Sequence, residues 1–224
     1  MPSIKACIFD LDGVIVETNH YHFLAWKRLA DELDIPFTEK DNEQLKGVSR
    51  VGSLAHILKL GDRELGEAEK ERLMNQKNQW YLEYLEDLRP SDALPGVVDF
   101  LRSLKANGIT SSIASSSKNA RSIIAKLELD DLFDAHKDGN DVTIAKPNPD
   151  IFLKAAEALN EEPENCIVFE DALAGIEAAK RAGMRCVGVG DKTTLKDADY
   201  VISSFEELDL EKFSDLFHQK STQI

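Results

Sequence analysis

The sequence has few positive charges for its size. Its 224 residues include 27 Lys and Arg against 41 Asp and Glu, which gives a formal net charge of −14. Because this excess of acidic groups would repel the phosphates of nucleic acid, we expect no nucleic-acid partner. A phosphate-bearing ligand must then be small, and positive side chains at its binding site must balance the charge of the phosphate.

Paired cysteines and long apolar runs are also missing. The three cysteines, Cys7, Cys166 and Cys186, lie far apart inside apolar runs, without the spacing of a zinc site or a redox motif. No apolar run approaches the roughly 20 residues that cross a bilayer, and no basic-then-apolar signal segment begins the sequence. These absences indicate buried, reduced thiols and a soluble cytoplasmic protein without a membrane partner.

Short β-rich segments alternate with amphipathic helical patterns over most of the sequence. Strands are expected at 4–9, 109–114, 166–170, 185–190 and 199–203, and helices at 96–108, 118–129, 149–160 and 172–184. This alternation predicts a doubly wound α/β fold, in which helices cover both faces of a mostly parallel sheet. Gly108 and Gly183 are expected to end two of the helices in the left-handed conformation.

The segment from 19 to 88 interrupts the alternation. It contains helical patterns but no convincing strand, so we predict an all-helical bundle inserted after the first strand. The expected hinges are 13–18 and 89–95, and the second of them carries turn chemistry. The predicted domains are an α/β core, residues 1–15 and 93–224, and a helical cap, residues 16–92.

Four polar clusters lie beside the predicted strands. Asp10 and Asp12 come directly after the first strand, "SSSKN" follows the second, "AKPNPD" precedes a later helix, and "EDALAG" follows the strand at 166–170. Because ligands gather at the carboxyl ends of parallel strands, we expect these clusters to form one site. Each cluster alone is more often a turn or a helix cap, and only their joint occurrence in this order indicates a site.

Asp10 and Asp12 place two like charges at one strand end, where repulsion and partial desolvation oppose ionisation. Together with Glu170 and Asp171 they offer hard oxygen ligands that suit Mg²⁺, which would relieve the repulsion. Glu170 and Asp171 could instead cap the helix that begins near Ala172. We expect Asp10 to attack phosphorus and form an aspartyl phosphate. Asp12 is expected to protonate the departing oxygen and to deprotonate the incoming hydroxyl.

The sequence resembles a known family in these same regions. The segments "DLDGVIVET", "SIASSSKN", "AKPNPDIF" and "VFEDALAGIEAAKRAGM" are similar to the four signature regions of the haloacid dehalogenase superfamily of phosphotransferases. Within that superfamily, "HYHFLAWKRLA", "LKGVSR" and "SSSKN" resemble the cap and substrate-contact segments of its glucose-phosphate mutases. The resemblance implies a Rossmann-like core with a helical cap and a need for Mg²⁺. It also implies interconversion of β-D-glucose 1-phosphate and β-D-glucose 6-phosphate through β-glucose 1,6-bisphosphate, and we expect a monomer.

The resemblance implies roles for further residues. Ser115 would donate a hydrogen bond to the transferring phosphoryl group, and Lys146 would neutralise charge on that group and on Asp10. The substrate-binding candidates lie in the cap and at the start of the helix expected at 118–129: Thr18, His22, Trp26, Gly47, Val48, Arg50, Lys77, Ser117, Lys118 and Asn119. The last three would bind the phosphate that is not being transferred, and residues 47, 48 and 50 would contact it or the sugar. As alternatives, His22 could be a core histidine, and Arg50 could be a solvated charge.

Two other functions remain open. In a sugar-phosphate phosphatase, water rather than a sugar hydroxyl would resolve the phosphate on Asp10, and the core motifs do not separate the two activities. A non-catalytic binding protein is less favoured because it needs no nucleophile. Ala172 stands where many relatives carry a serine, and the missing hydroxyl could loosen the orientation of Asp171.

Overall fold

A parallel sheet is the centre of the fold. The computed structural model describes residues 4–209 and 212–213, and within them a six-stranded sheet has the order β3-β2-β1-β4-β5-β6 with every neighbouring pair parallel. The strands are β1 (Ala6–Phe9), β2 (Thr110–Ala114), β3 (Ala135–Lys137), β4 (Cys166–Glu170), β5 (Arg185–Val189) and β6 (Tyr200–Ile202). The predicted doubly wound α/β fold is confirmed.

β1 lies in the middle of the sheet because both of its faces are apolar. Cys7 and Phe9 join one buried cluster, whereas Ala6 and Ile8 join the cluster on the opposite face. A strand without a polar face is typical of the centre of a parallel sheet. The strand therefore ends in solvent-free surroundings, directly before Asp10.

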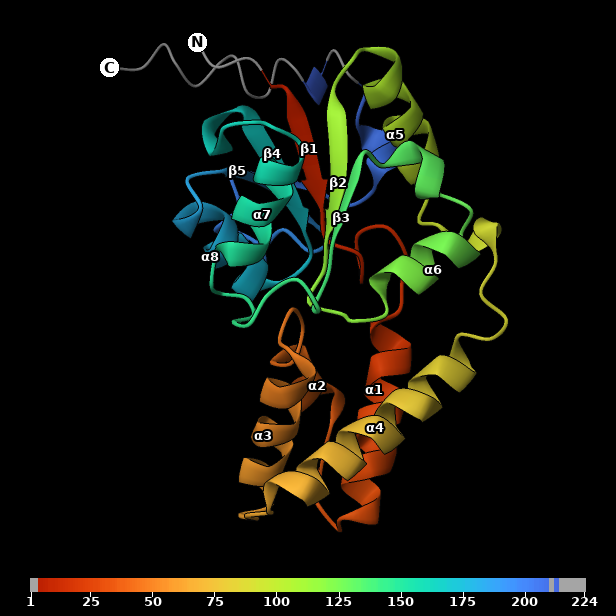
Figure 1. The fold of residues 1–224 in the computed structure, drawn as a ribbon, viewed down its shortest axis with the longest axis vertical. Coiled ribbons are helices and arrows are strands. Elements are labelled where there is room, and N and C mark those ends of the chain that lie inside the picture. Colours follow the sequence, from red (N-terminus) through yellow and green to blue (C-terminus); the bar gives the residue numbers. More distant parts are fainter. Residues whose placement is uncertain (1–3, 210–211, 214–224) are drawn as a thin grey trace.

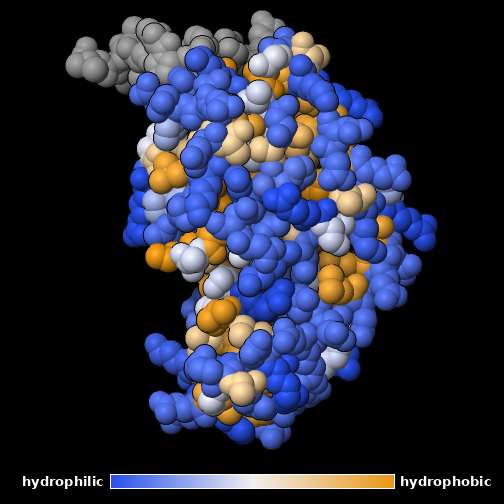
Figure 2. Space-filling view, viewed as in Figure 1, coloured by the Kyte–Doolittle hydropathy of each residue, from blue (hydrophilic) through white to orange (hydrophobic). Residues whose placement is uncertain are grey.

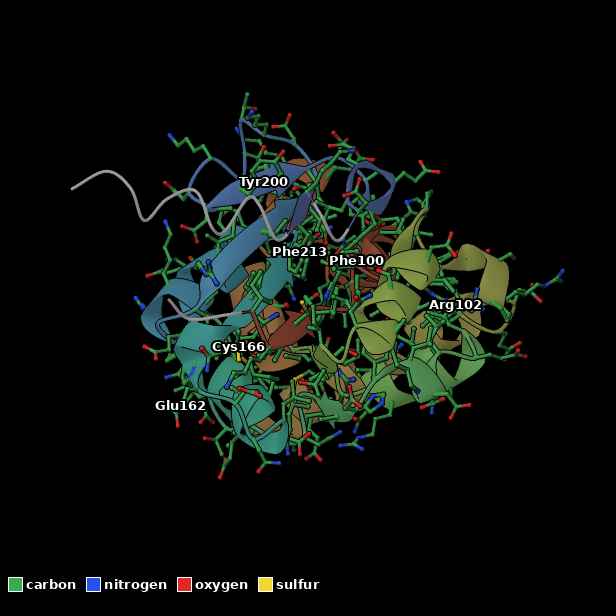
Figure 3. All side chains as sticks on the ribbon, turned by 90° about the horizontal axis from the view of Figure 1, so that it is seen from above. Phe100, Arg102, Glu162, Cys166, Tyr200 and Phe213 are labelled. Carbon is green, nitrogen blue, oxygen red and sulfur yellow. The ribbon has the colours of Figure 1, made fainter. Side chains whose placement is uncertain are left out.

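Helices cover both faces of this sheet (Figure 1). α5 (Val97–Ala106) and α6 (Ala120–Lys126) pack into the cluster that contains Phe9, and α7 (Asp150–Ala158) and α8 (Leu173–Arg181) pack into the other. The rings of Phe100 and Phe213 pack edge to face, with centroids 5.4 Å apart. Figure 3 shows both labelled residues in the interior and Arg102 toward the outside. Among the described residues there are also four single-turn helices, at Pro90–Asp92, Asp130–Leu132, Pro163–Asn165 and Phe205–Glu207.

Two glycines end helices as predicted. Gly108 and Gly183 follow α5 and α8 with φ of 70° and 75°, in the left-handed region. Glycine adopts this conformation at little cost in energy because it has no side chain.

Four helices form a separate group at the carboxyl end of the sheet (Figure 1). They are α1 (Asn19–Glu32), α2 (Glu39–Glu43), α3 (Arg50–Leu60) and α4 (Glu67–Tyr84). α1 packs along α4, and no described helix is long and apolar enough to cross a membrane. The predicted boundaries, 1–15 and 93–224 for the core and 16–92 for the cap, remain a prediction that this arrangement supports.

Candidate active site

A cavity of about 350 Å³ lies between the core and the cap helices. Figure 2 shows the corresponding indentation between the upper and lower parts of the molecule. Most of the predicted site residues line the cavity: Asp10, Asp12, His22, Trp26, Gly47, Val48, Arg50, Lys77, Ser117, Lys118 and Asn119. The others, Thr18, Ser115, Lys146, Glu170 and Asp171, contact or adjoin this lining in the ways described below.

Asp10 and Lys146 form a buried ion pair at the end of β1. Asp10 is 5 % exposed, and its backbone N–H donates to the carbonyl oxygen of Phe169 in β4 at 3.0 Å. The Nζ of Lys146 donates to Asp10 Oδ1 at 2.5 Å and to Glu170 Oε1 at 2.6 Å. Burial raises the pKa of Asp10 to about 7 even though Lys146 opposes the shift. Burial alone would lower the pKa of Lys146, but the two carboxylates outweigh it and raise the pKa.

Asp12 faces the cap instead. Its Oδ1 accepts a hydrogen bond from Thr18 Oγ1, lies 3.5 Å from the hydroxyl of Tyr81 and lies 3.6 Å from His22 Nε2. Burial alone would raise the pKa of Asp12, but the hydrogen bonds and charge of His22, together with the Thr18 bond, hold the pKa below its usual value. The pKa values of the two aspartates are therefore shifted in opposite directions although only one residue separates them.

A buried lysine stands behind His22. Lys77 Nζ lies 2.8 Å from His22 Nδ1 and 4.7 Å from the ring centroids of both Trp26 and Tyr81. Burial lowers the pKa of Lys77 well below its ordinary value, and nearby Arg50 lowers it further. The pKa of His22 is lowered by burial and by Lys77, so a neutral imidazole is favoured beside Asp12.

The loop before α6 is closed by its own hydrogen bonds. Ser115 is fully buried, and its Oγ accepts from the backbone N–H of Ser117 at 3.1 Å; the Oγ of Ser117 in turn accepts from the backbone N–H of Asn119 at 3.2 Å. The hydroxyl of Ser116 donates to the carbonyl oxygen of Gly47 at 2.8 Å, which joins this core loop to the cap. The predicted residues of both parts are thus brought to one place.

Asp171 lies where a cation would be favourable. Burial raises its pKa well above the usual value, and Glu170 and Asp10 add to the shift. Both oxygens of Glu170 are engaged, one by Lys146 and the other by the backbone N–H of Ala172 at 2.8 Å. Within the described ranges, no three acidic, His or Cys side chains converge as a complete ligand set. The neighbouring carboxylates of Asp171, Glu170 and Asp10 are nevertheless oxygen ligands of the kind that a hard cation prefers.

Asn19 holds the carboxylate of Asp171. Its Nδ2 donates to Asp171 Oδ2 at 3.0 Å, so the orientation that a hydroxyl at position 172 would have supplied comes from the first residue of α1. Both side chains pack on Gly13, which has φ of 79° and where any side chain would collide with them. This close approach explains the glycine after Asp12.

The sequence did not reveal several polar residues of the site, among them Asn19, Lys46 and Asn78. Lys46 and Asn78 line the cavity beside the predicted Gly47 and Lys77. Burial alone would lower the pKa of Lys46, but a hydrogen bond to Glu43 and the charge of Asp171 raise it. In the sequence, Lys46 and Asn78 differ from other polar residues only in standing next to a predicted site residue. In a helix or turn, that position says little about where a side chain points.

Comparison with known proteins agrees with this geometry. Residues 4–183 match the family model for haloacid dehalogenase-like hydrolases. β-Phosphoglucomutase of Bacillus subtilis (strain 168) is 46 % identical over 222 residues, which cover 98 % of this chain and 96 % of that protein. A phosphorylated carbohydrates phosphatase of Thermotoga maritima is 33 % identical over 190 residues, covering 83 % of this chain and 85 % of the relative.

A solved structure is similarly close. The crystal structure of β-phosphoglucomutase from Clostridium difficile superposes with a TM-score of 0.95 at 40 % identity, covering 98 % of this chain and all of that one. These similarities confirm the predicted resemblance to the glucose-phosphate mutases, and with it the prediction of an enzyme. The chain belongs to the haloacid dehalogenase-like hydrolase family.

Proposed function

We propose that the chain interconverts β-D-glucose 1-phosphate and β-D-glucose 6-phosphate through β-glucose 1,6-bisphosphate, with Mg²⁺ and a phosphate carried on Asp10. One observation carries the proposal: two sets of groups suited to phosphate line or adjoin a single cavity. Asp10 with Lys146 is the first set. The second, here called the distal phosphate subsite, comprises Arg50, Ser117, Lys118 and Asn119. A substrate with two phosphates needs both.

The reaction divides into two phosphoryl transfers. In the first, the 6-hydroxyl of glucose 1-phosphate attacks the phosphate on Asp10; a bond forms between phosphorus and the sugar oxygen, the bond to the carboxylate breaks, and Asp12 takes the hydroxyl proton. The bisphosphate then binds in the opposite orientation. Asp10 attacks the phosphorus at C1, the bond to O1 breaks, and Asp12 returns the proton to O1. Glucose 6-phosphate leaves, and the phosphate on Asp10 is restored.

The surroundings of the two aspartates support this division of labour. The lowered pKa of Asp12 favours its ionised form, which is the form that can take the hydroxyl proton in the first transfer. Lys146 places a buried positive charge beside the nucleophile, where negative charge develops on the phosphoryl oxygens. Ser115 accepts a hydrogen bond from the backbone and so keeps its own proton for a phosphoryl oxygen.

Asp10 and Asp171 are the residues best placed to hold Mg²⁺, and Asp12 and Glu170 remain predicted ligands. Bound there, the ion would supply positive charge to the transferring phosphoryl group. His22, Trp26 and Lys77, with Gly47 and Val48, line the cavity and are proposed to bind the sugar from the cap side. Thr18, which is bonded to Asp12, is proposed to assist them. We further propose a cytoplasmic monomer; the burial of three unpaired cysteines supports the compartment.

The deciding experiment supplies β-glucose 1-phosphate, Mg²⁺ and a trace of the bisphosphate, and measures glucose 6-phosphate against free phosphate. We expect glucose 6-phosphate as the main product. The phosphatase named among the relatives shows the alternative outcome. If the enzyme releases mainly free phosphate with bisphosphate present, the mutase proposal fails and a phosphatase takes its place.

A variant of the proposed nucleophile tests the alternative that the chain is a binding protein without catalytic activity. Asp10→Asn keeps the size and the fold but removes the attacking carboxylate, so both phosphoenzyme and turnover are expected to disappear. Substantial phosphotransfer by a well-folded Asp10→Asn protein would remove Asp10 from the mechanism.

A further inference from the structure

Two of the groups in the distal phosphate subsite converge on a single neutral oxygen. Arg50 donates from one terminal guanidinium nitrogen to Asn78 Oδ1 at 2.6 Å, and Asn119 donates from its Nδ2 to the same oxygen at 2.9 Å. Asn78 belongs to α4, and it lines the cavity beside both donors. One amide oxygen therefore fixes two side chains that come from different parts of the chain.

The three residues join the cap to the core at the subsite. Arg50 is the first residue of α3, and Asn78 lies in the second half of α4, so both belong to the cap helices. Asn119 precedes α6 on the core. Their shared hydrogen bonds hold a cationic group of the cap beside an amide of the core, and both groups can donate to phosphate oxygens.

The bonds to Asn78 leave donors for a ligand. A guanidinium carries five N–H groups and a side-chain amide carries two, so Arg50 retains four and Asn119 retains one after each gives a hydrogen to Asn78. A phosphate oxygen can then accept from both residues while Asn78 keeps them side by side. Arginine in such a fixed position can bind phosphate through two parallel hydrogen bonds.

The chemistry of residue 78 decides between recruiting and repelling the ligand. A carboxylate there would accept the same two hydrogen bonds more strongly, but it would bring a negative charge next to a phosphate dianion. An amide oxygen positions the donors at no such electrostatic cost. An apolar residue of similar size would leave both donors without their common acceptor.

We propose that Asn78 is a positioning residue and a charge filter of the distal phosphate subsite: its amide oxygen aligns Arg50 and Asn119, and its neutrality admits the second phosphate of a sugar bisphosphate. The inference deepens the proposed function and rests on it for the identity of the ligand. It adds a residue whose contribution lies in binding the remote phosphate and not in the chemistry at Asp10.

The test compares Asn78→Asp with Asn75→Asp. Asn75 is exposed on the same helix, one turn earlier, so the control adds the same charge to α4 outside the cavity. For Asn78→Asp we expect the KM for β-glucose 1,6-bisphosphate to rise by about tenfold or more, since a like charge close to the phosphate opposes binding. Phosphorylation of Asp10 by acetyl phosphate, which has no second phosphate, should stay within about twofold, because the chemical step is unchanged.

A second variant separates alignment from charge. Asn78→Ala removes the acceptor without adding charge, and we expect its KM for the bisphosphate to rise severalfold but less than that of Asn78→Asp. The proposal is wrong if Asn78→Asp leaves this KM unchanged or if Asn75→Asp raises it equally. It is also wrong if Asn78→Asp loses activity with the bisphosphate and with acetyl phosphate in parallel, together with a lowered Tm. The KM for the bisphosphate can be read from glucose 6-phosphate or from released phosphate, so a phosphatase result would overturn the proposed function and leave this test decisive.

Discussion

Asp10 and Asp12 are separated by one residue, but they have opposite neighbours. Asp10 faces Lys146 in the core, and Asp12 faces Thr18, His22 and Tyr81 of the cap. Because β1 ends at Phe9, both aspartates lie in the turn that follows it, where strand alternation no longer keeps residues two apart on the same side. Separate roles as nucleophile and as acid and base follow from separate surroundings, as in other sites where paired carboxylates are tuned differently.

The first prediction tests that separation. Asp12→Asn should still accept a phosphoryl group from acetyl phosphate, because that leaving group needs no proton. Turnover of β-glucose 1-phosphate should fall by about 10²–10⁴-fold, the usual contribution of a general acid or base. Phosphoenzyme formation and sugar turnover are measured side by side. Equal losses with both donors would show that Asp12 does not transfer the proton.

The second prediction concerns Asn19 and the metal. Asn19→Ala removes the hydrogen bond to Asp171 Oδ2, and loss of a partner that orients a metal ligand typically weakens binding by about 10–100-fold. Calorimetry with Mg²⁺ alone measures the affinity without any turnover. Adding Ala172→Ser to the same variant should restore part of it, because a hydroxyl then adjoins Asp171. An unchanged Mg²⁺ affinity in Asn19→Ala would contradict this role.

Residues in the ordered motifs could be predicted from the sequence, whereas Asn19, Lys46 and Asn78 could not. Asp10, Lys146 and Asp171 stand in ordered motifs beside strand ends, where position alone indicates chemistry. Asn19 acts through a contact with a residue 152 positions away, and only the fold brings the two together. An isolated asparagine carries no periodicity or charge pattern that would reveal such a contact.

The helices and strands that the sequence did not predict include two short ones, β3 and α2. β3 has three residues, Ala135–Lys137, and lacks the apolar run by which the other strands were recognised. It forms because pairing with Ser112–Ala114 of β2 satisfies its backbone. α2 begins with a capping box at Thr38 and Asp41, a local signal that the longer helical patterns around it obscured.

The third prediction concerns the junction between α6 and the end of α4. Lys126 Nζ donates to the carbonyl oxygens of Leu85 and Glu86, each at 3.1 Å, just after α4 ends. A cation at a helix C-terminus contributes about 0.3–1 kcal/mol. Lys126→Met should therefore speed amide exchange in residues 80–90 by up to about fivefold.

Hydrogen exchange read by mass spectrometry provides the measurement, and Lys105→Met provides the matched control. Lys105 also donates from an exposed side chain to a carbonyl oxygen, that of Asp131, but both residues lie in the core. Lys105→Met should leave the rate of amide exchange near the end of α4 unchanged. If amide exchange accelerates equally in both variants, or does not accelerate in Lys126→Met, then Lys126 does not stabilise the junction between the cap and the core.

At the scale of the whole molecule, the cap and the core share one apolar cluster. It runs from Trp26 and Leu29 in the cap, through Ile15 at the hinge, to Phe9 and Phe100 in the core. Continuous burial of this kind favours unfolding of both parts together, because exposing one part exposes apolar surface of the other.

The fourth prediction uses the two tryptophans of the sequence, Trp26 and Trp80, which both lie in cap helices. Their fluorescence reports on the cap alone, whereas far-ultraviolet circular dichroism reports on the entire chain. In urea the two signals should give one midpoint, as a cooperative unit does. A fluorescence midpoint at lower urea would mean that the cap unfolds first and that the shared cluster does not couple the two parts.

The edges of the sheet have a consequence for self-association. β3 and β6 are the outer strands, and at three residues each they are the shortest of the described sheet. Long, flat edges invite a second sheet to add its own strand, while short edges with charged side chains such as Lys137 discourage it. Copies of this protein at high concentration thus have little exposed backbone through which to extend the sheet into a fibre.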